Sequence, residues 1–193
     1  MKIARFSVDN GARFGVLNEE TNRFHLLSGD PLYSGFEQSG QVVSRDEIRF
    51  VAPMLPRSKV IGFVQNFNCG EADTIENKLL STYIKPNTSV IGPDVPITLP
   101  RWVSNGEAEV TPQLGLIISR PCKDVPESMV KDIIFGYMLV SAVGLSALAG
   151  SDPAKAYAFD TSCPSGPIIE TGLPSGKFEF TFDAGRKVTT VPP

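Results

Sequence analysis

The stretch Ile133–Gly150 reads IIFGYMLVSAVGLSALAG and carries no charged side chain. A membrane-spanning helix needs about 20 apolar residues, so this stretch reaches only the lower limit of length. Gly136, Gly144, Tyr137 and two serines interrupt it. We therefore predict a strand buried on both faces that continues into a short apolar helix, and no membrane span.

Short apolar runs separated by Pro and Gly follow on both sides of this stretch, which favours a sheet-rich fold. The strands predicted in the second part of the chain are Val60–Phe63, Val90–Ile91, Ile97–Leu99, Leu114–Ile118, Ile168–Ile169, Phe178–Phe182 and Val188–Val191. Asp183–Arg186 is predicted as the turn between the last two. Helical signals in this part are few, and the clearest besides the short apolar helix above lie at Pro126–Asp132 and Glu71–Leu80.

The first fifty residues contain short strand-like runs joined by turn sequences, and this pattern predicts a small β-rich unit. Lys2–Val8 and Ala12–Leu17 read as a hairpin joined by Asp9-Asn10-Gly11, and Phe24–Leu27 reads as a third strand. Asp30-Pro31 predicts an N-cap and first turn of a helix over Leu32–Phe36. Two prolines, Pro53 and Pro56, then stop regular structure. We predict an α+β, mostly β fold, with a small N-terminal domain over residues 1–52 and a second domain over 57–193.

Composition narrows the class of protein. Apolar residues make up 41% and charged residues 20%, with a formal net charge of −3, which is typical of a folded globular chain and gives no basic footprint for nucleic acid. The three cysteines, Cys69, Cys122 and Cys163, form no closely spaced pair, so neither a disulfide framework nor a thiolate zinc site is expected. Without a secretion signal at its start, the chain is expected in the cytoplasm.

Six short motifs in the second part occur in an order that resembles the fumarylacetoacetate hydrolase family, whose members cleave, decarboxylate or isomerise small oxo and enol acids. The motifs are Val60–Phe63, Ile84–Pro86 with Val90–Pro93, Pro96–Pro100, Arg120–Val125, Ile134–Tyr137 and Phe159–Pro167. The resemblance implies a rolled, mixed β-sandwich with a small N-terminal domain, commonly a dimer. Closing Pro-Gly-Asp and Thr-Gly-Thr-Pro segments of the family are missing, so the second domain looks shortened at its C-terminus.

The resemblance also implies a divalent cation held by a Glu-x-Glu pair on one strand and by an aspartate after the Phe-Gly-Tyr motif. Side chains two apart on a strand share a face and can converge on one hard cation. Counted without gaps, these positions fall on Thr111, Gln113 and Ala142. All three carboxylates are gone, so no metal site is predicted.

The groups that transfer protons in the family are changed as well. The positions of its histidine and partner glutamate read Asn68 and Glu71, and a family lysine corresponds to Tyr157, with Lys155 nearby. An amide has no usable pKa for general base catalysis. The one histidine, His25, lies in the N-terminal unit and is interpreted as a surface or half-buried side chain.

What the resemblance leaves is the outline of a pocket. Lys85 matches the family lysine of the Lys-Pro motif, and Thr161 matches a threonine near the metal site; a surface lysine and a turn threonine with a local hydrogen bond are the plainer interpretations. The predicted ligand-binding residues are Lys85, Asn68, Glu71, Tyr157 and Thr161. No catalytic residue is assigned.

The leading hypothesis is therefore a family member without metal-dependent catalysis, acting as a binding module or partner subunit that keeps an oxo-acid pocket. We expect a homodimer or a heteromer with an active homologue, and no cofactor.

Two enzyme hypotheses stay open. In one, Glu107 and Glu109 shift into register and bind Mg²⁺ or Mn²⁺, with Asp152 or Asp160 as the third carboxylate; the plainer interpretation of the pair is a solvated loop after Asn105-Gly106. In the other, Lys85 and Asn68 orient a substrate for metal-independent tautomerisation or cyclisation.

Overall fold

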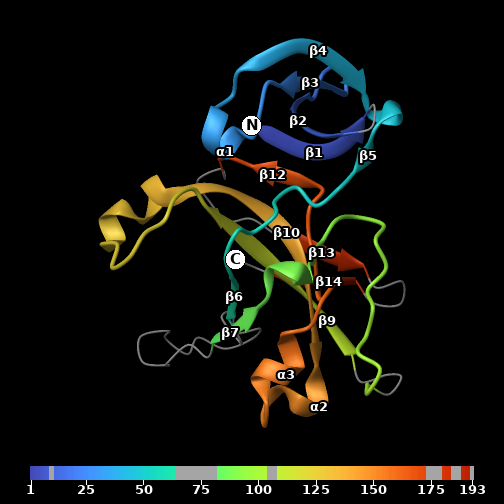
Figure 1. Ribbon diagram of the computed structural model, residues 1–193, viewed down its shortest axis with the longest axis vertical. Coiled ribbons are helices and arrows are strands. Elements are labelled where there is room, and N and C mark those ends of the chain that lie inside the picture. The colour runs from blue at the N-terminus through green and yellow to red at the C-terminus, as the bar shows by residue number, and fades with distance from the viewer. Residues whose placement is uncertain (9–10, 64–81, 104–107, 173–179, 184–187, 192–193) are drawn as a thin grey trace.

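The computed structural model describes residues 1–8, 11–63, 82–103, 108–172, 180–183 and 188–191. A sheet formed by the first fifty residues lies at one end of the molecule, and two short helices lie at the other end (Figure 1). Two long strands, β9 and β10, run between these ends and position the candidate site.

The N-terminal unit is an antiparallel meander with a core of its own on one face. Its elements are β1 (Lys2–Val8), β2 (Gly11–Asn18), β3 (Arg23–Leu27), α1 (Pro31–Ser34), β4 (Gln38–Ser44), the 3₁₀ helix η1 (Arg45–Glu47) and β5 (Arg49–Phe50). Ala4 and Phe6 lie two residues apart on β1, so both side chains enter one core, where they meet Phe24 and Leu26. The rings of Phe6 and Phe24 lie 5.1 Å apart. This confirms the predicted hairpin strands and the third strand.

A single eight-stranded sheet joins this unit to the rest of the chain. Its strand order is β4-β3-β2-β1-β12-β10-β9, with β5 also pairing β1. The joining strand, β12 (Ile168–Glu170), pairs with β1 on one side and with β10 on the other. A second core crosses this joint, because Ile3 packs with Ile117 and Ile169. The two ends of the molecule therefore share both hydrogen bonds and buried apolar surface.

The apolar stretch that opened the sequence forms β10 (Ile134–Leu145) followed directly by α2 (Ser146–Ala149). This confirms the predicted strand that continues into a short helix. The predicted burial on both faces is wrong, because Leu139 in the middle of β10 is 55% exposed and only the last four residues of the strand are consecutively buried. β10 pairs with β9 (Ala108–Ile118) along nearly its full length. None of the helices in the described part of the chain has the length and apolar character needed to cross a membrane.

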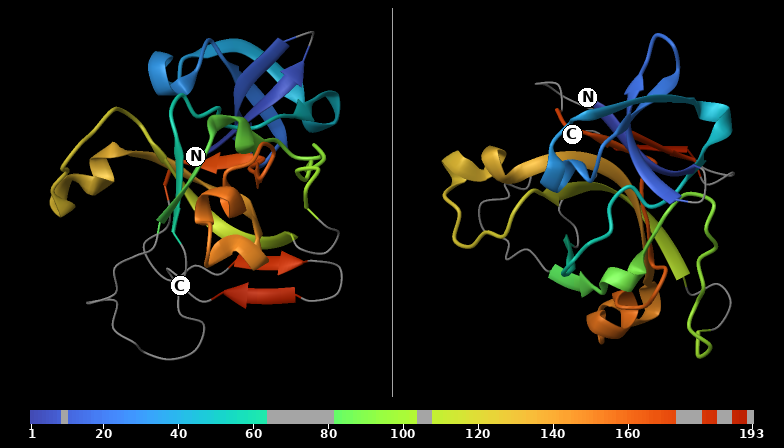
Figure 2. Two further views of the ribbon diagram at one scale, coloured as in Figure 1. Left: turned by 60° about the horizontal axis from the view of Figure 1, so that its bottom comes forward. Right: turned by 45° about the horizontal axis from the view of Figure 1, so that its top comes forward.

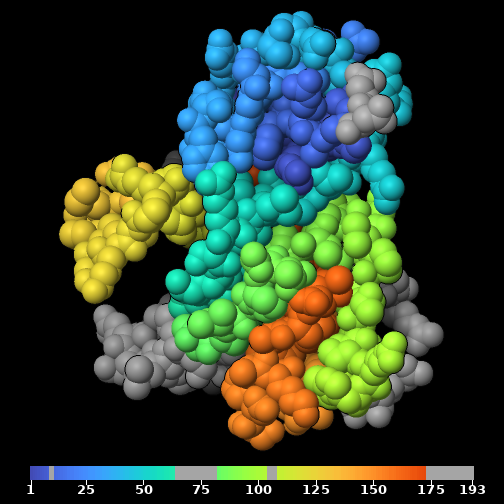
Figure 3. Space-filling view, viewed as in Figure 1, coloured from blue at the N-terminus to red at the C-terminus, as the bar shows by residue number. Residues whose placement is uncertain are grey.

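Smaller elements complete the described part of the chain, and Figure 2 shows their arrangement from two further directions. They are β6 (Val60–Phe63), β7 (Thr82–Lys85), the 3₁₀ helices η3 (Asn87–Ser89) and η4 (Glu127–Ile133), β8 (Val90–Ile91), α3 (Pro153–Tyr157), β11 (Cys163–Pro164), β13 (Phe180–Asp183) and β14 (Val188–Val191). β6 pairs with β7, β8 with β11, and β13 with β14. In the space-filling view the segment that contains η4 projects away from the body (Figure 3).

Several sequence predictions need correction. Ile97–Leu99 forms no strand, since Pro96 and Pro100 remove two backbone donors from a segment whose side chains are largely exposed. The helix predicted over Pro126–Asp132 is a 3₁₀ helix. The predicted strand Leu114–Ile118 extends back to Ala108, and the solvated loop expected at Glu109 is part of that strand, although the side chain is exposed.

Other predictions hold or lie outside the described residues. Asp30 caps α1 by accepting a hydrogen bond from Leu32 N at 3.0 Å, and Pro31 begins the helix, as predicted. The helix ends at Ser34 rather than Phe36. His25 is half-buried on β3, within the expected range. Some predictions fall outside the described residues. These are the helix at Glu71–Leu80, the turns around residues 9–10 and 184–187, and part of the strand starting at Phe178.

Candidate functional site

Strand β7 places two side chains in the interior beside the β9–β10 ribbon. Tyr83 and Lys85 are buried and alternate with exposed Thr82 and Ile84, as a strand with one covered face requires. A glycine makes room for them on the paired strand β6, because a Cβ at Gly62 would lie 2.1 Å from the Tyr83 ring. The local sequence thus inserts a phenol and an ammonium group side by side under the surface.

Lys85 is the central residue of a cluster that also contains Tyr83, Tyr157, Ser162 and Cys163, which we call the Lys85 cluster. Only 1% of its surface is exposed. Its Nζ donates hydrogen bonds to the backbone carbonyl of Val143 at 2.7 Å, to that of Tyr157 at 2.9 Å and to Ser162 Oγ at 2.9 Å. The three hydrogens of the ammonium group are therefore all used, and they join β10, the end of α3 and the segment before β11. The plainer interpretation of a surface lysine is wrong.

Burial changes the acid strength of the groups in this cluster. Loss of solvation lowers the pKa of Lys85 from 10.5 to about 8, and the neighbouring Cys163 thiol opposes the fall. Burial raises the pKa of Cys163, an effect that the charge of Lys85 reduces. At neutral pH Lys85 still carries its charge, and the site holds a buried cation without a carboxylate partner among the described residues.

Aromatic rings connect Lys85 to the β9 strand. Tyr83 stacks on Tyr157 with ring centroids 4.1 Å apart, and Nζ of Lys85 lies 5.6 Å from the centroid of each ring. The Tyr83 hydroxyl donates to Gln113 Oε1 at 3.2 Å. Burial raises the pKa of Tyr83, so this hydroxyl keeps its proton at neutral pH. Lys85 therefore lies beside the Tyr83 ring, and the Tyr83 hydroxyl in turn bonds to Gln113.

The three positions expected for metal ligands lie together on the same ribbon. Thr111 and Gln113 are two residues apart on β9 and share a face, and Ala142 is directly opposite Thr111 on β10. The register runs without a shift from Gly136 paired with Ile117 to the end of the ribbon. The structure thus brings together one hydroxyl, one amide and one methyl group.

These side chains do not fit a hard dication, which prefers several charged oxygen ligands. Gln113 Oε1 already accepts the Tyr83 hydroxyl, and Ala142 has no donor atom. In the described part of the chain no three His, Cys, Asp or Glu side chains are grouped closely enough to hold a metal ion.

The carboxylates of the shifted-register hypothesis are spread out. Glu109 lies opposite Gly144 and is exposed. Asp152 caps α3 by accepting from Lys155 N at 3.0 Å, and Asp160 accepts from the Thr88 hydroxyl. Glu107 lies outside the described residues.

Of the predicted ligand-binding residues, the structure brings Lys85 and Tyr157 together. Thr161 adopts a positive φ of 62° and turns away, with its hydroxyl oxygen accepting from Thr98 N at 2.8 Å. Thr98 and Thr161 are far apart in the sequence, so the interpretation of Thr161 as a turn residue with a local hydrogen bond is wrong. Asn68 and Glu71 lie outside the described residues.

Tyr83, Ser162 and Cys163 were not selected from the sequence, although all three belong to the cluster. A signal for Tyr83 was present, since it precedes Lys85 by two residues on a strand and must share its face. Ser162 and Cys163 reach Lys85 only because β11 pairs in parallel with β8, a contact between distant segments that no local pattern indicates.

Comparison with known proteins gives two matching family models. Residues 63–179 match the fumarylacetoacetate (FAA) hydrolase C-terminal model, and residues 1–53 match the Rv2993c-like N-terminal model. The first covers more than half of the chain.

Three individual proteins illustrate the likeness. Protein Rv2993c of Mycobacterium tuberculosis is 31% identical over 186 residues, which cover 90% of this chain and 67% of the relative. The structure of 5-carboxymethyl-2-hydroxymuconate delta-isomerase from Mycobacterium smegmatis superimposes with a TM-score of 0.84 at 28% identity, over 98% of this chain and 76% of that one. Oxaloacetate tautomerase fahd2, mitochondrial, of Xenopus laevis is 26% identical over 72% of this chain and 44% of its own length. The chain thus spans well under the full length of its relatives.

Proposed function

The chain belongs to the fumarylacetoacetate hydrolase family, and from this premise we propose that it is a binding module for small oxo or enol acids that has given up the family's metal-dependent catalysis. One observation carries the proposal: Thr111, Gln113 and Ala142 are neighbours on one face of the β9–β10 ribbon. The strands keep the geometry that would let three carboxylates converge, and the side chains offer no negative charge.

The buried charge of Lys85 supports a preference for anionic ligands at this face. A cation in a poorly solvated position is stabilised by a nearby anion more strongly than it would be in water. Because the three Nζ hydrogens bond to the protein, Lys85 would act through its field, and the Tyr83 hydroxyl and Gln113 amide would make the direct contacts. Oxo acids carry the carboxylate and carbonyl oxygens that such groups recognise.

An exposed apolar face supports the partner-subunit part of the proposal. Leu116, Ile118 and Leu139 are each about half exposed on the side of the ribbon that faces away from Tyr83. Contiguous apolar side chains on a sheet surface are typical of a subunit interface. We propose that this face packs against a second family subunit, and light scattering on the purified protein tests it: a strictly monomeric particle that co-purifies with no homologue would contradict the proposal.

Placing carboxylates at Thr111, Gln113 and Ala142 tests the proposal that the natural protein has lost its metal site. The triple variant Thr111→Glu, Gln113→Glu, Ala142→Asp should bind Mn²⁺ in a calorimetric titration, whereas the natural protein should show no saturable heat. The matched control is Leu114→Glu with Leu139→Asp, which puts two acids opposite each other on the other face of the same strands. Saturable Mn²⁺ binding by the natural protein, abolished by Glu109→Gln, would overturn the proposal in favour of the shifted register.

A second candidate is metal-independent tautomerisation, which only moves a proton between carbon and oxygen of one molecule. The buried charge of Lys85 would stabilise the negative charge of the enolate that forms between the two tautomers, and the names of the Xenopus and M. smegmatis relatives describe a tautomerase and an isomerase. Oxaloacetate enol-to-keto conversion, followed by ultraviolet absorbance with EDTA present, decides between the two. A rate above the spontaneous one that is lost in Lys85→Met but retained in Lys155→Met would favour the enzyme; equal rates would favour the binding module.

A further inference from the structure

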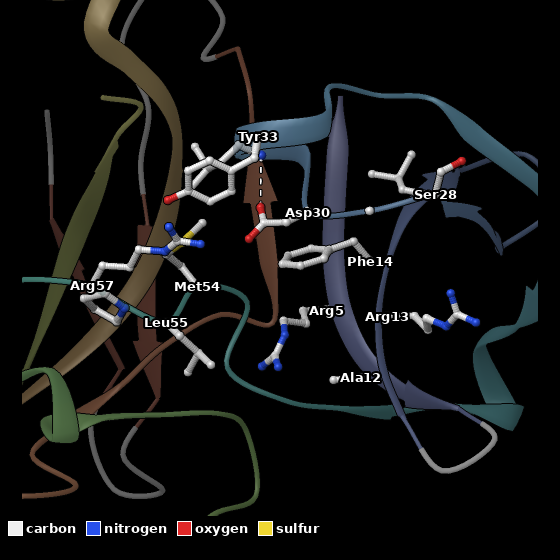
Figure 4. A pocket seen from close by; sticks show the side chains of 14 residues that line it. Arg5, Ala12, Arg13, Phe14, Ser28, Asp30, Tyr33, Met54, Leu55 and Arg57 are labelled. Carbon is white, nitrogen blue, oxygen red and sulfur yellow. Dashed lines mark hydrogen bonds between the residues drawn. The ribbon is translucent and has the colours of Figure 1, made fainter. Parts of the chain in front are cut away.

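A hollow of about 520 Å³ opens in the N-terminal unit, away from the Lys85 cluster and sharing no residue with it. β1 and β2 form its floor, the segment leading into α1 forms one wall, and the linker of residues 54–57 forms the other. Its volume lies within the range of small-molecule sites. Figure 4 shows the side chains that line it.

Arginines on two sides give this hollow a positive character. Arg5 comes from β1 and Arg57 from the linker, and neither forms an ion pair with a carboxylate of the described residues. Arg5 makes one long hydrogen bond, from Nη1 to the Ala52 carbonyl at 3.4 Å. A third arginine, Arg13, directs its guanidinium away from the centre (Figure 4). Two planar cations therefore have donors left for a ligand.

An aromatic ring holds the guanidinium group of Arg57, which lies 4.1 Å from the centroid of the Tyr33 ring. Arg5 lies 5.9 Å from the centroid of Phe14, which is too far for stacking. Stacking on a ring uses the face of a guanidinium and leaves the N–H groups at its edge free to bind a carboxylate through two parallel bonds. Such preorganisation lowers the entropy lost when an anion binds.

The other side chains that line the hollow determine which kind of ligand body fits beside the carboxylate. Leu55 is 54% and Tyr33 59% exposed, and Met54 lies beside them in the wall. One carboxylate, Asp30, also lines the hollow, with one oxygen occupied by Leu32 N. Its negative charge disfavours a compact, multiply charged anion such as phosphate, while the apolar side chains favour a flat hydrocarbon body.

We propose that this hollow binds a small organic monocarboxylate with a flat, unsaturated or aromatic body. The carboxylate is held by the edge of Arg57, Arg5 adds positive charge from the other side of the hollow, and the body lies against Tyr33, Met54 and Leu55. The site is independent of the oxo-acid site proposed above, since the two are formed by different strands and different cations.

Calorimetric titration with trans-cinnamate tests this inference on the whole chain. Cinnamate should bind saturably, and cinnamamide, which has the same body without the charge, should bind at least tenfold more weakly. Arg57→Gln should weaken cinnamate binding about tenfold, as expected for loss of a charge-assisted bidentate contact. The matched control Arg49→Gln removes an exposed arginine from β5, outside the hollow, and should leave binding unchanged.

Three results would overturn the inference: equal affinity for cinnamate and cinnamamide, an equal loss in Arg49→Gln and Arg57→Gln, or competition by inorganic phosphate at the same concentration as cinnamate. Arg57 is exposed, so Arg57→Gln should fold, and an unchanged thermal melt verifies this. If it does not fold, Tyr33→Leu, which removes the ring under the guanidinium, serves as the second variant and should also weaken cinnamate binding. The triple variant at Thr111, Gln113 and Ala142 should bind cinnamate normally, which separates this site from the oxo-acid site.

Discussion

Replacement of Lys85 by methionine removes the buried cation while keeping much of the side-chain volume. The change in the free energy of unfolding depends on two opposing contributions, the cost of burying the charge and the gain from its hydrogen bonds. Moving the lysine pKa from 10.5 to about 8 corresponds to an unfavourable contribution of roughly 3 kcal/mol for the charged form. Hydrogen bonds from a charged donor contribute roughly 1.5–3 kcal/mol each, and Lys85 makes three. The difference between these contributions predicts that Lys85→Met lowers the free energy of unfolding by about 1.5–6 kcal/mol at pH 7.

The same residue gives the stability of the natural protein a distinctive dependence on pH. The pKa of Lys85 is lower in the folded than in the unfolded chain, so above pH 8 the unfolded chain binds more protons and the free energy of unfolding rises with pH. The raised pKa values of Cys163 and Tyr83 act in the opposite direction, from their ordinary values of 9.0 and 10.0 upward. The effect of Lys85 is therefore largest relative to the opposing groups between pH 8 and 9. Over this range it should raise the free energy of unfolding by about 1 kcal/mol.

Urea unfolding followed by far-ultraviolet circular dichroism at pH 7, 8 and 9 measures both effects. Lys155→Met is the matched control, because Lys155 is exposed and its Nζ lies 4.4 Å from the Trp102 ring centroid. The control should keep the rise between pH 8 and 9, and Lys85→Met should lose it. Parallel pH profiles for all three proteins would refute the reasoning, as would a natural protein that loses stability over this window.

Three further substitutions test the packing that supports the site. Phe24→Ala should cost about 3–5 kcal/mol in urea unfolding, because the ring is fully buried in the N-terminal core; a loss below 1 kcal/mol would contradict that placement. Gly144→Ala places a Cβ 2.3 Å from the ring of Tyr157, so it should cost about 1–3 kcal/mol and reduce the near-ultraviolet dichroism of the stacked tyrosines; an unchanged spectrum would argue against the stack. Asp152→Ala removes the cap of α3, and a loss of about 1 kcal/mol that Asp152→Asn restores is expected, whereas equal losses would point to charge rather than capping.

Much of the fold followed from local patterns. The hairpin at the N-terminus, the capped turn at Asp30-Pro31 and the uncharged stretch after Ile133 were each predicted from spacing and turn chemistry, and each is present. The predictions failed where pairing overrides local preference. Glu109 follows a turn sequence, yet it belongs to β9 because β10 extends far enough to pair with it.

The candidate site shows the same division. Spacing predicted that Thr111 and Gln113 share a face, and the family resemblance located Ala142 near them; the ribbon register places all three together. The environment of Lys85 could not be predicted, because its three acceptors come from segments 58 to 77 residues away along the chain.

Local sequence was enough to identify the available side chains, which are a ribbon without carboxylates at three positions, one lysine in a Lys-Pro motif and an alternating strand that carries it. The burial of this lysine, the fall in its pKa and the hydrogen bond between Tyr83 and Gln113 depend on how distant segments pack together. The reason is physical, since alternation along a strand is a property of neighbouring residues, whereas desolvation depends on which distant segments cover them.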